Sequence, residues 1–206
     1  AIVMAVLVIG VTVFAINKNG EELSSSSANQ SVNLVDVNSD DYKNFMTYLG
    51  EDYDRYFIAN MIAHHQGAIE MGNMAIEKAQ HQELKDLGNA IVSAQTGEVN
   101  NMTSWQTQWG YPVSSGEMMM DHSAMGMMAQ MDGMSESLKS LSGDAFDKAF
   151  LAQMIIHHQS AINMAAPGKT NALHQEVKDL TAAIISAQTS EIKQMKQWQS
   201  DWGYIN

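Results

Sequence analysis

The sequence predicts an all-α protein, a four-helix bundle made of two duplicated helical hairpins, and three observations indicate this fold. Residues 54–111 align without a gap with residues 147–204 at a constant offset of 93, and about half of the aligned positions are identical. Within each copy, apolar residues recur at the three-four spacing of one helix face. The chain of 206 residues contains only two prolines, so little in it interrupts long helices. Because 93 residues is too long for a solenoid repeat, we expect one supersecondary unit used twice in a single domain.

The chain is predicted to divide into three parts. Residues 1–17 form an apolar N-terminal helix, and residues 18–39, rich in Ser and Asn, form a flexible polar tether. Residues 40–206 form the bundle, opened by a short helix at 40–49. The apolar stretch falls just short of a comfortable membrane span, and we expect an uncleaved anchor. A cleaved signal segment and an apolar helix that packs into an assembly are the alternatives.

Inside the bundle, the two repeats account for the four long helices. In repeat 1, residues 50–111, one apolar stripe begins at Phe57, a turn follows near Gln80, and a second stripe ends at Trp109. The Gly-Tyr-Pro sequence that follows stops the helix, since Pro cannot continue it and Gly readily caps it. Repeat 2, residues 143–204, has the same pattern, and residues 112–140 link the two hairpins.

The charge and cysteine content exclude some classes of function. The net charge is −12 and the chain has a single arginine, so a basic surface for nucleic acid is absent. There is no cysteine. A metal protein without thiolates fits an oxidising compartment, and we expect the bundle on the periplasmic or extracellular side, anchored to the membrane by the N-terminal helix.

Each repeat carries two adjacent histidines on the apolar stripe of its first helix. They are His64 with His65, and His157 with His158. Adjacent residues lie about 100° apart on a helix, so His64 and His157 are predicted to point into the core while their neighbours flank it at the helix–helix seam. Such histidines are often satisfied core residues that only set the register of a bundle. Methionines on the same face, among them Met61 and Met154, favour metal ligation instead.

A glutamate interrupts the apolar stripe of the second helix in each repeat. Counting back from the hairpin turns places Glu98 opposite His64 and Glu191 opposite His157. A buried carboxylate is costly unless it is paired, so we expect each glutamate to be the partner of that histidine. The same count brings Met102 near Met61 and Met195 near Met154. These two glutamates and two methionines are predicted to support the metal ligands or to replace one of them.

The linker is the strongest indication of soft-metal chemistry. Nine of its residues between positions 118 and 134 are Met or His: Met118, Met119, Met120, His122, Met125, Met127, Met128, Met131 and Met134. Thioethers are neutral, soft donors that hold Cu(I) and have little affinity for Zn²⁺, Mg²⁺ or Ca²⁺. The alternative is a Met-rich helix that packs on the bundle or binds a partner flexibly.

The pattern Phe-x-x-x-Met-x-x-His-His-x-x-Ala-x-x-Met in both copies, with the closing Trp-Gly-Tyr, resembles the bacterial family called domain of unknown function 305. The resemblance covers residues 40–204 and implies a ferritin-like four-helix bundle. The family includes periplasmic or secreted copper-binding proteins linked to copper resistance, which implies metal binding rather than turnover. The ligand positions that it implies are His64, His65, His157, His158, Met61, Met71, Met154 and Met164. Met74 has Pro167 as its counterpart, so a ligand role for Met74 cannot be shared by both copies.

These observations lead to the hypothesis of a cell-envelope copper-binding protein, not an enzyme, that sequesters, buffers or passes on copper. Cu(I) is the preferred ion, with Cu(II) at the histidines. Expected partners are the metal ion, a protein that receives copper and the membrane; nucleic acid is not expected, and an oligomer stays open. A di-iron or di-manganese oxidase competes, but it needs Glu-x-x-His, which the chain lacks. The other alternative is a structural or assembly module anchored by its apolar N-terminus.

Overall fold

The computed structural model describes residues 34–111, 129 and 133–204, and these residues are largely helical. The predicted anchor at 1–17, most of the tether and the Met-rich part of the linker up to Met131 lie outside the described residues. Within the described part, the β-structure is limited to one isolated parallel bridge between Gly50 and Ala172. The all-α prediction is therefore confirmed.

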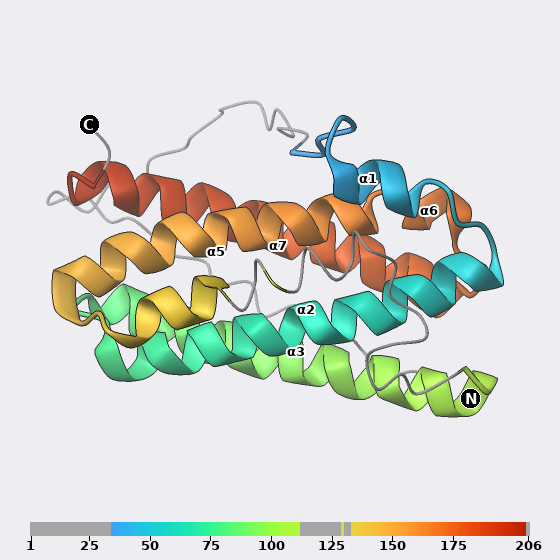
Figure 1. Ribbon diagram of the computed structural model, residues 1–206, viewed down its shortest axis with the longest axis horizontal. Helices are drawn as coiled ribbons and strands as arrows, with labels where there is room; N and C mark the ends of the chain where they lie inside the picture. Colours follow the sequence, from blue (N-terminus) through green and yellow to red (C-terminus); the bar gives the residue numbers. More distant parts are fainter. Residues whose placement is uncertain (1–33, 112–128, 130–132, 205–206) are drawn as a thin grey trace, which may run out of the picture. The chain divides into compact units, whose positions relative to one another are not determined.

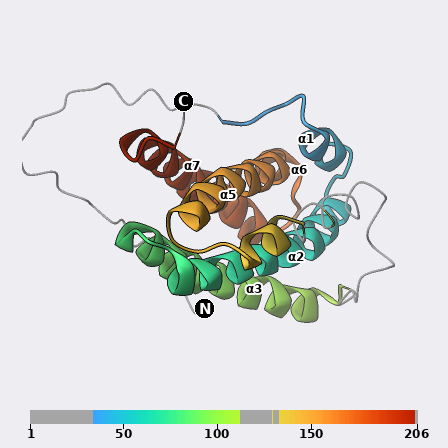
Figure 2. The ribbon, with the colours of Figure 1, turned by 60° about the vertical axis from the view of Figure 1, so that its left-hand side comes forward.

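Two antiparallel hairpins build the bundle (Figure 1). The first consists of α2 (Glu51–Lys78) and α3 (Gln82–Trp109), and the second of α5 (Gly143–Ala165) and α7 (Gln175–Asp201). The turn predicted near residue 80 falls between α2 and α3. The hairpins meet through α2 and α5, which lie against each other, while α3 packs on α2 and α7 packs on α5 (Figure 2).

The second hairpin differs from the first at Pro167. Proline removes a backbone donor and clashes with the preceding turn of a helix, so α5 ends at Ala165 and is shorter than α2. A one-turn helix, α6 (Gly168–Asn171), then precedes the turn into α7. The repeated pattern had not predicted this extra turn.

A short helix, α1 (Asp40–Phe45), precedes the bundle in the chain. The sequence predicted a helix there, but α1 stops before residue 49. Ser39 caps it, since its hydroxyl accepts a hydrogen bond from the Tyr42 amide. The residues just before it, assigned by the sequence to the tether, contact α5: the Asp36 amide donates to the side chain of Asn163 at 2.9 Å. This end of the tether is thus hydrogen-bonded to the bundle.

The core combines aromatic residues with methionine. Phe57 and Phe150, which are counterparts in the two repeats, are fully buried in α2 and α5. Close packing of the first hairpin depends on small residues: a Cβ added at Gly88 would lie 2.7 Å from the carbonyl oxygen of Gly72. None of the helices in the described part combines the length and the apolar character that a membrane crossing demands.

Candidate metal centre

His64 and His157 meet at the centre of the bundle, where α2 and α5 cross. Their ring centroids lie 3.7 Å apart with the planes tilted by 42°. The Nε2 atom of His157 donates a hydrogen bond to the backbone oxygen of His64 at 3.1 Å. Both rings are buried, as their helical phase predicted. We call these two residues the central pair.

Burial has an electrostatic consequence for the central pair. Burial is the largest cause of a pKa well below the ordinary value of 6.5 at both His64 and His157, because a charged imidazole would lose its hydration there. The neighbouring imidazoles of His65 and His158 lower both pKa values further. The central pair is therefore neutral around pH 7, the state in which an imidazole can ligate a metal.

The second histidine of each pair faces the outer helix of its own hairpin. The Nε2 atom of His65 lies 2.6 Å from Oε2 of Glu98, and His158 makes the same contact with Glu191 at 2.6 Å. The prediction that Glu98 and Glu191 pair with the first histidines was wrong. A step of about 100° separates adjacent residues, so the side of α2 that faces α3 carries the second histidine, and the side that faces α5 carries the first.

Several ring nitrogens of these histidines have no hydrogen-bond partner within the described residues. They are Nδ1 and Nε2 of His64, and Nδ1 of His65, His157 and His158. A buried polar atom without a partner costs about 1–3 kcal/mol, so native proteins rarely keep several together. A neutral imidazole keeps one N–H, so these five atoms include at most four lone pairs, one from each histidine. A metal ion is the kind of ligand that such lone pairs could accept.

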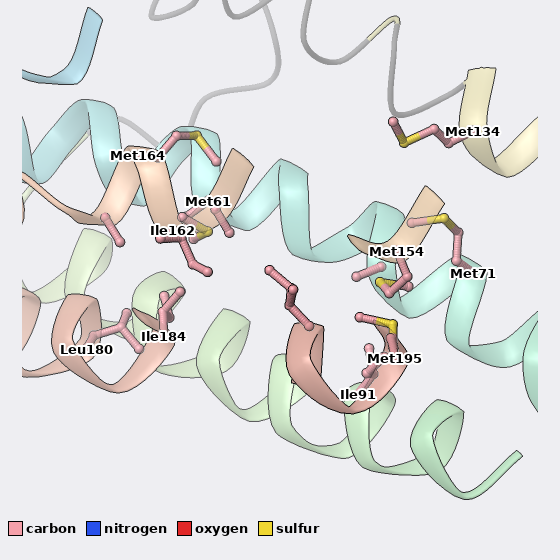
Figure 3. Packing of buried hydrophobic residues seen from close by; sticks show 14 of the residues in the cluster. Met61, Met71, Ile91, Met134, Met154, Ile162, Met164, Leu180, Ile184 and Met195 are labelled. Carbon is pink, nitrogen blue, oxygen red and sulfur yellow. The ribbon is translucent and has the colours of Figure 1, made fainter. Parts of the chain in front are cut away.

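Buried methionines lie on the same helices, α2 and α5, as the four histidines, and one more lies on α7. Figure 3 shows two groups of thioethers, Met61 with Met164, and Met71 with Met154 and Met195. Met61 and Met71 of the first repeat correspond to Met154 and Met164 of the second. Each group therefore contains one methionine from α2 and one from α5. All five are fully buried. Their sulfur atoms could complete a coordination sphere that begins at the imidazoles.

Two other methionines named by the sequence are also buried in the described structure. Met102, the counterpart of Met195, is fully buried in α3. Met134 lies at the start of a helical segment at 133–139 and is buried as well. The remaining linker candidates, Met118 to Met131 with His122, lie outside the described residues.

In the described residues, the imidazoles and carboxylates alone do not form a metal-binding group. Across residues 34–111 and 133–204, no three side chains of His, Asp or Glu come together in a way that could hold an ion. A metal centre built on these imidazoles would need donors of another kind, and the buried thioethers are candidates. Thioethers suit a soft ion better than a hard one.

His81 lies at the start of α3, close to the hairpin turn, but its partners were not predicted from the sequence. Its Nδ1 atom donates to Oδ2 of Asp147 at 2.7 Å, and its ring stacks on Trp202 with centroids 3.8 Å apart. Asp147 also accepts from the backbone amides of Gln80 and His81, each at 2.9 Å, and so caps the start of α3. A carboxylate of the second hairpin thus holds an imidazole and a helix end of the first.

The reverse contact joins the hairpins at the other end. His174 donates to Asp54 at 2.7 Å and stacks on Trp109 with centroids 3.7 Å apart. Asp54 caps α7 by accepting from the amides of Leu173 and His174. The one available signal was an acidic residue identical in both copies at the start of each apolar stripe, since Asp54 and Asp147 are counterparts.

Comparison with known proteins gives matches over most of the bundle. The family model described as "Domain of unknown function (DUF305)" matches residues 54–199. The solved structure "CopM in the Cu(II)-bound form" is 39% identical with a TM-score of 0.63, over 75% of this chain and 99% of that chain. "CopM in the Cu(I)-bound form" is 40% identical with a TM-score of 0.59, over 72% and 96%.

A more distant structure has the same fold. The DUF305 fragment from Deinococcus radiodurans is 25% identical with a TM-score of 0.61, and the match covers 75% of this chain and 99% of that chain. CopM has also been solved in an Ag-bound form and in an apo form. No curated protein matches the chain.

Proposed function

The chain belongs to the DUF305 family, and we propose that it is a copper-binding protein of the cell envelope that sequesters, buffers or passes on the metal. The observation that carries the proposal is the CopM series. A protein 38–40% identical to this chain, matched over 96–99% of its own length, has been solved with Cu(I), Cu(II) and Ag. Copper is here cargo, and no chemical turnover is required.

The donor set of the bundle supports Cu(I) as the preferred ion. Neutral imidazole and thioether are soft to intermediate ligands, and the buried histidines and methionines offer both in one apolar interior. An apolar, closed interior also favours a monovalent ion over a divalent one, because the Born cost of burial rises with the square of the charge. Glu98 and Glu191 add anionic groups at the edge of the cluster.

The cellular location is part of the proposal. The chain has no cysteine, which fits a copper-binding protein that works outside the reducing cytosol. Its apolar first segment is proposed to anchor it to the membrane. Fractionation of intact cells, followed by protease treatment of the outer surface, would check this placement; recovery in the cytosol would contradict it.

Titration of the purified chain with Cu(I) under reducing conditions, in competition with a chromogenic Cu(I) chelator, tests the binding proposal. We expect a dissociation constant well below micromolar and little competition from Zn²⁺. Alanine at both His64 and His157 should weaken binding at least tenfold while circular dichroism stays helical. Alanine at His81 and His174, a matched pair outside the cluster, should leave the affinity unchanged. Binding no tighter than micromolar in the unaltered chain would refute the proposal.

A further inference from the structure

The rings of His65 and His158 connect the edge of the bundle to its interior. Each ring is fully buried, whereas the glutamate side chain that it contacts is partly exposed, by 23% for Glu98 and by 27% for Glu191. The contact is made by Nε2 at 2.6 Å in both hairpins. The opposite ring nitrogen, Nδ1, is buried and has no partner within the described residues.

This arrangement selects one tautomer. An ionised carboxylate can only accept hydrogen bonds, so Nε2 of His65 carries the hydrogen that Glu98 receives. In the neutral ring the lone pair then lies on Nδ1. The same reasoning holds for His158 and Glu191. Both flanking histidines therefore present a free lone pair away from the glutamate.

We infer that Glu98 and Glu191 are positioning residues, which hold His65 and His158 in the Nε2–H tautomer so that each offers Nδ1 to copper bound among the buried histidines and methionines. This inference rests on the proposed function and specifies its ligand atoms. Histidine ligands commonly donate their second ring N–H to a carboxylate, which fixes the ring and raises its basicity. The glutamates act through the imidazoles and do not themselves bind the ion.

The chemistry of the carboxylates agrees with these roles, in which the imidazoles bind the ion and the glutamates position the imidazoles. Oε2 of each glutamate is already engaged by a ring N–H, and the group retains contact with water. Carboxylate oxygen is a hard donor that suits Mg²⁺ or Ca²⁺. The neighbouring rings are softer imidazoles: the centroid of His64 lies 6.4 Å from that of His65, and His157 lies 6.1 Å from His158. A soft ion thus gains more from the imidazoles.

The tautomer of the metal-free chain can be measured directly by two-bond ¹H–¹⁵N correlation spectra of the histidine rings. We expect His65 and His158 to show the Nε2–H form in the unaltered protein. Observation of the Nδ1–H form at these two residues would overturn the inference before any metal is added.

Variants then connect the tautomer to the metal. Leucine at both Glu98 and Glu191 should let the two rings exchange tautomers and should weaken Cu(I) or Ag(I) binding about 10- to 100-fold. Glutamine at the same positions keeps a neutral acceptor and should restore most of the affinity. Leucine at Glu83 and Glu176, exposed counterparts with the same loss of charge, is the control and should change neither property.

The outcomes separate the two levels of the argument. If the unaltered chain binds no copper, the proposed function fails whatever the tautomer. If it binds copper and the leucine variants, still helical by circular dichroism, bind equally tightly, the positioning role is refuted while copper binding stands. A shift of tautomer without loss of affinity refutes it too, because Nδ1 would then not be a donor. Should the double leucine variant fail to fold, the single Glu98→Leu variant serves the same comparison.

Discussion

Replacing His64 with leucine should stabilise the metal-free protein, although it removes a central residue of the candidate metal centre. Both ring nitrogens of His64 are buried and make no hydrogen bond of ordinary geometry in the described structure; a weak contact with the backbone of His157 raises its pKa by less than burial lowers it. The substitution removes these two atoms and leaves an apolar side chain of similar volume between α2 and α5. His65, one residue along the helix, provides the contrast, since its Nε2 atom is hydrogen-bonded to Glu98.

The expected magnitudes follow from these contacts. Removing a buried polar group that lacks a partner gains about 1–3 kcal/mol, and imperfect repacking of a volume-conserving change takes back up to about 1.5 kcal/mol. The net gain should be about 1 kcal/mol, or roughly 2–4 °C in Tm for a domain of this size. His65→Leu should instead lose roughly 1 kcal/mol, because it breaks a charge-assisted hydrogen bond and leaves a carboxylate that water solvates only in part.

Urea denaturation of the metal-free proteins, followed by circular dichroism, measures both changes. The same series with Cu(I) present should reverse the order, since a ligand at 100 times its dissociation constant stabilises the folded state by about 2.7 kcal/mol and His64→Leu should lose most of that gain. Equal destabilisation of the metal-free chain by His64→Leu and His65→Leu would contradict this expectation. In that case the nitrogens of His64 would have partners, and the case for a site awaiting a ligand would weaken.

Three further outcomes are expected from the same structure. Asp54→Ala leaves the N-terminus of α7 without its acceptors and should cost about 1–3 kcal/mol in urea denaturation, whereas alanine at the exposed Asp52 should stay within about 0.5 kcal/mol. Gly168→Ala would place a Cβ 2.5 Å from the Thr181 side chain and should cost about 1–3 kcal/mol, whereas Gly97→Ala, a helix position with open space around it, should gain about 0.5–1 kcal/mol in thermal unfolding. Because burial lowers the pKa of both imidazoles of the central pair below 6.5, the unfolded chain binds protons there that the folded chain does not. The free energy of unfolding of the metal-free protein should therefore fall as the pH drops below about 6.5, by up to about 1.4 kcal/mol per pH unit for each imidazole; a flat profile between about pH 7 and 5.5 would contradict the stated cause.

Local patterns in the sequence were enough to predict the four long helices, although not the one-turn helix α6. The apolar stripes, the glycine after Trp109 and the proline at position 167 each act within a few residues, through helix phase, capping and loss of a backbone donor. For the same reason the sequence predicted that His64 and His157 point inward. A step of one residue turns a side chain by about 100°, and the stripe defines which of the two adjacent positions faces the core.

The partners of those residues depended on packing between segments far apart in the chain. Glu98 contacts His65 and not His64 because α3, the helix that carries Glu98, lies on a different side of α2 from α5. Counting residues from the turn gives the level along the axis but not this rotation. The Asp147–His81 contact spans 66 residues and joins two hairpins, so no local pattern contained it.

The chain alone thus determined which donors are present and on which helix faces they lie, because these follow from composition and helical period. The tertiary structure decided which nitrogens are engaged and which remain free for a metal, because hydrogen bonds form between helices whose relative rotation only the packed core establishes.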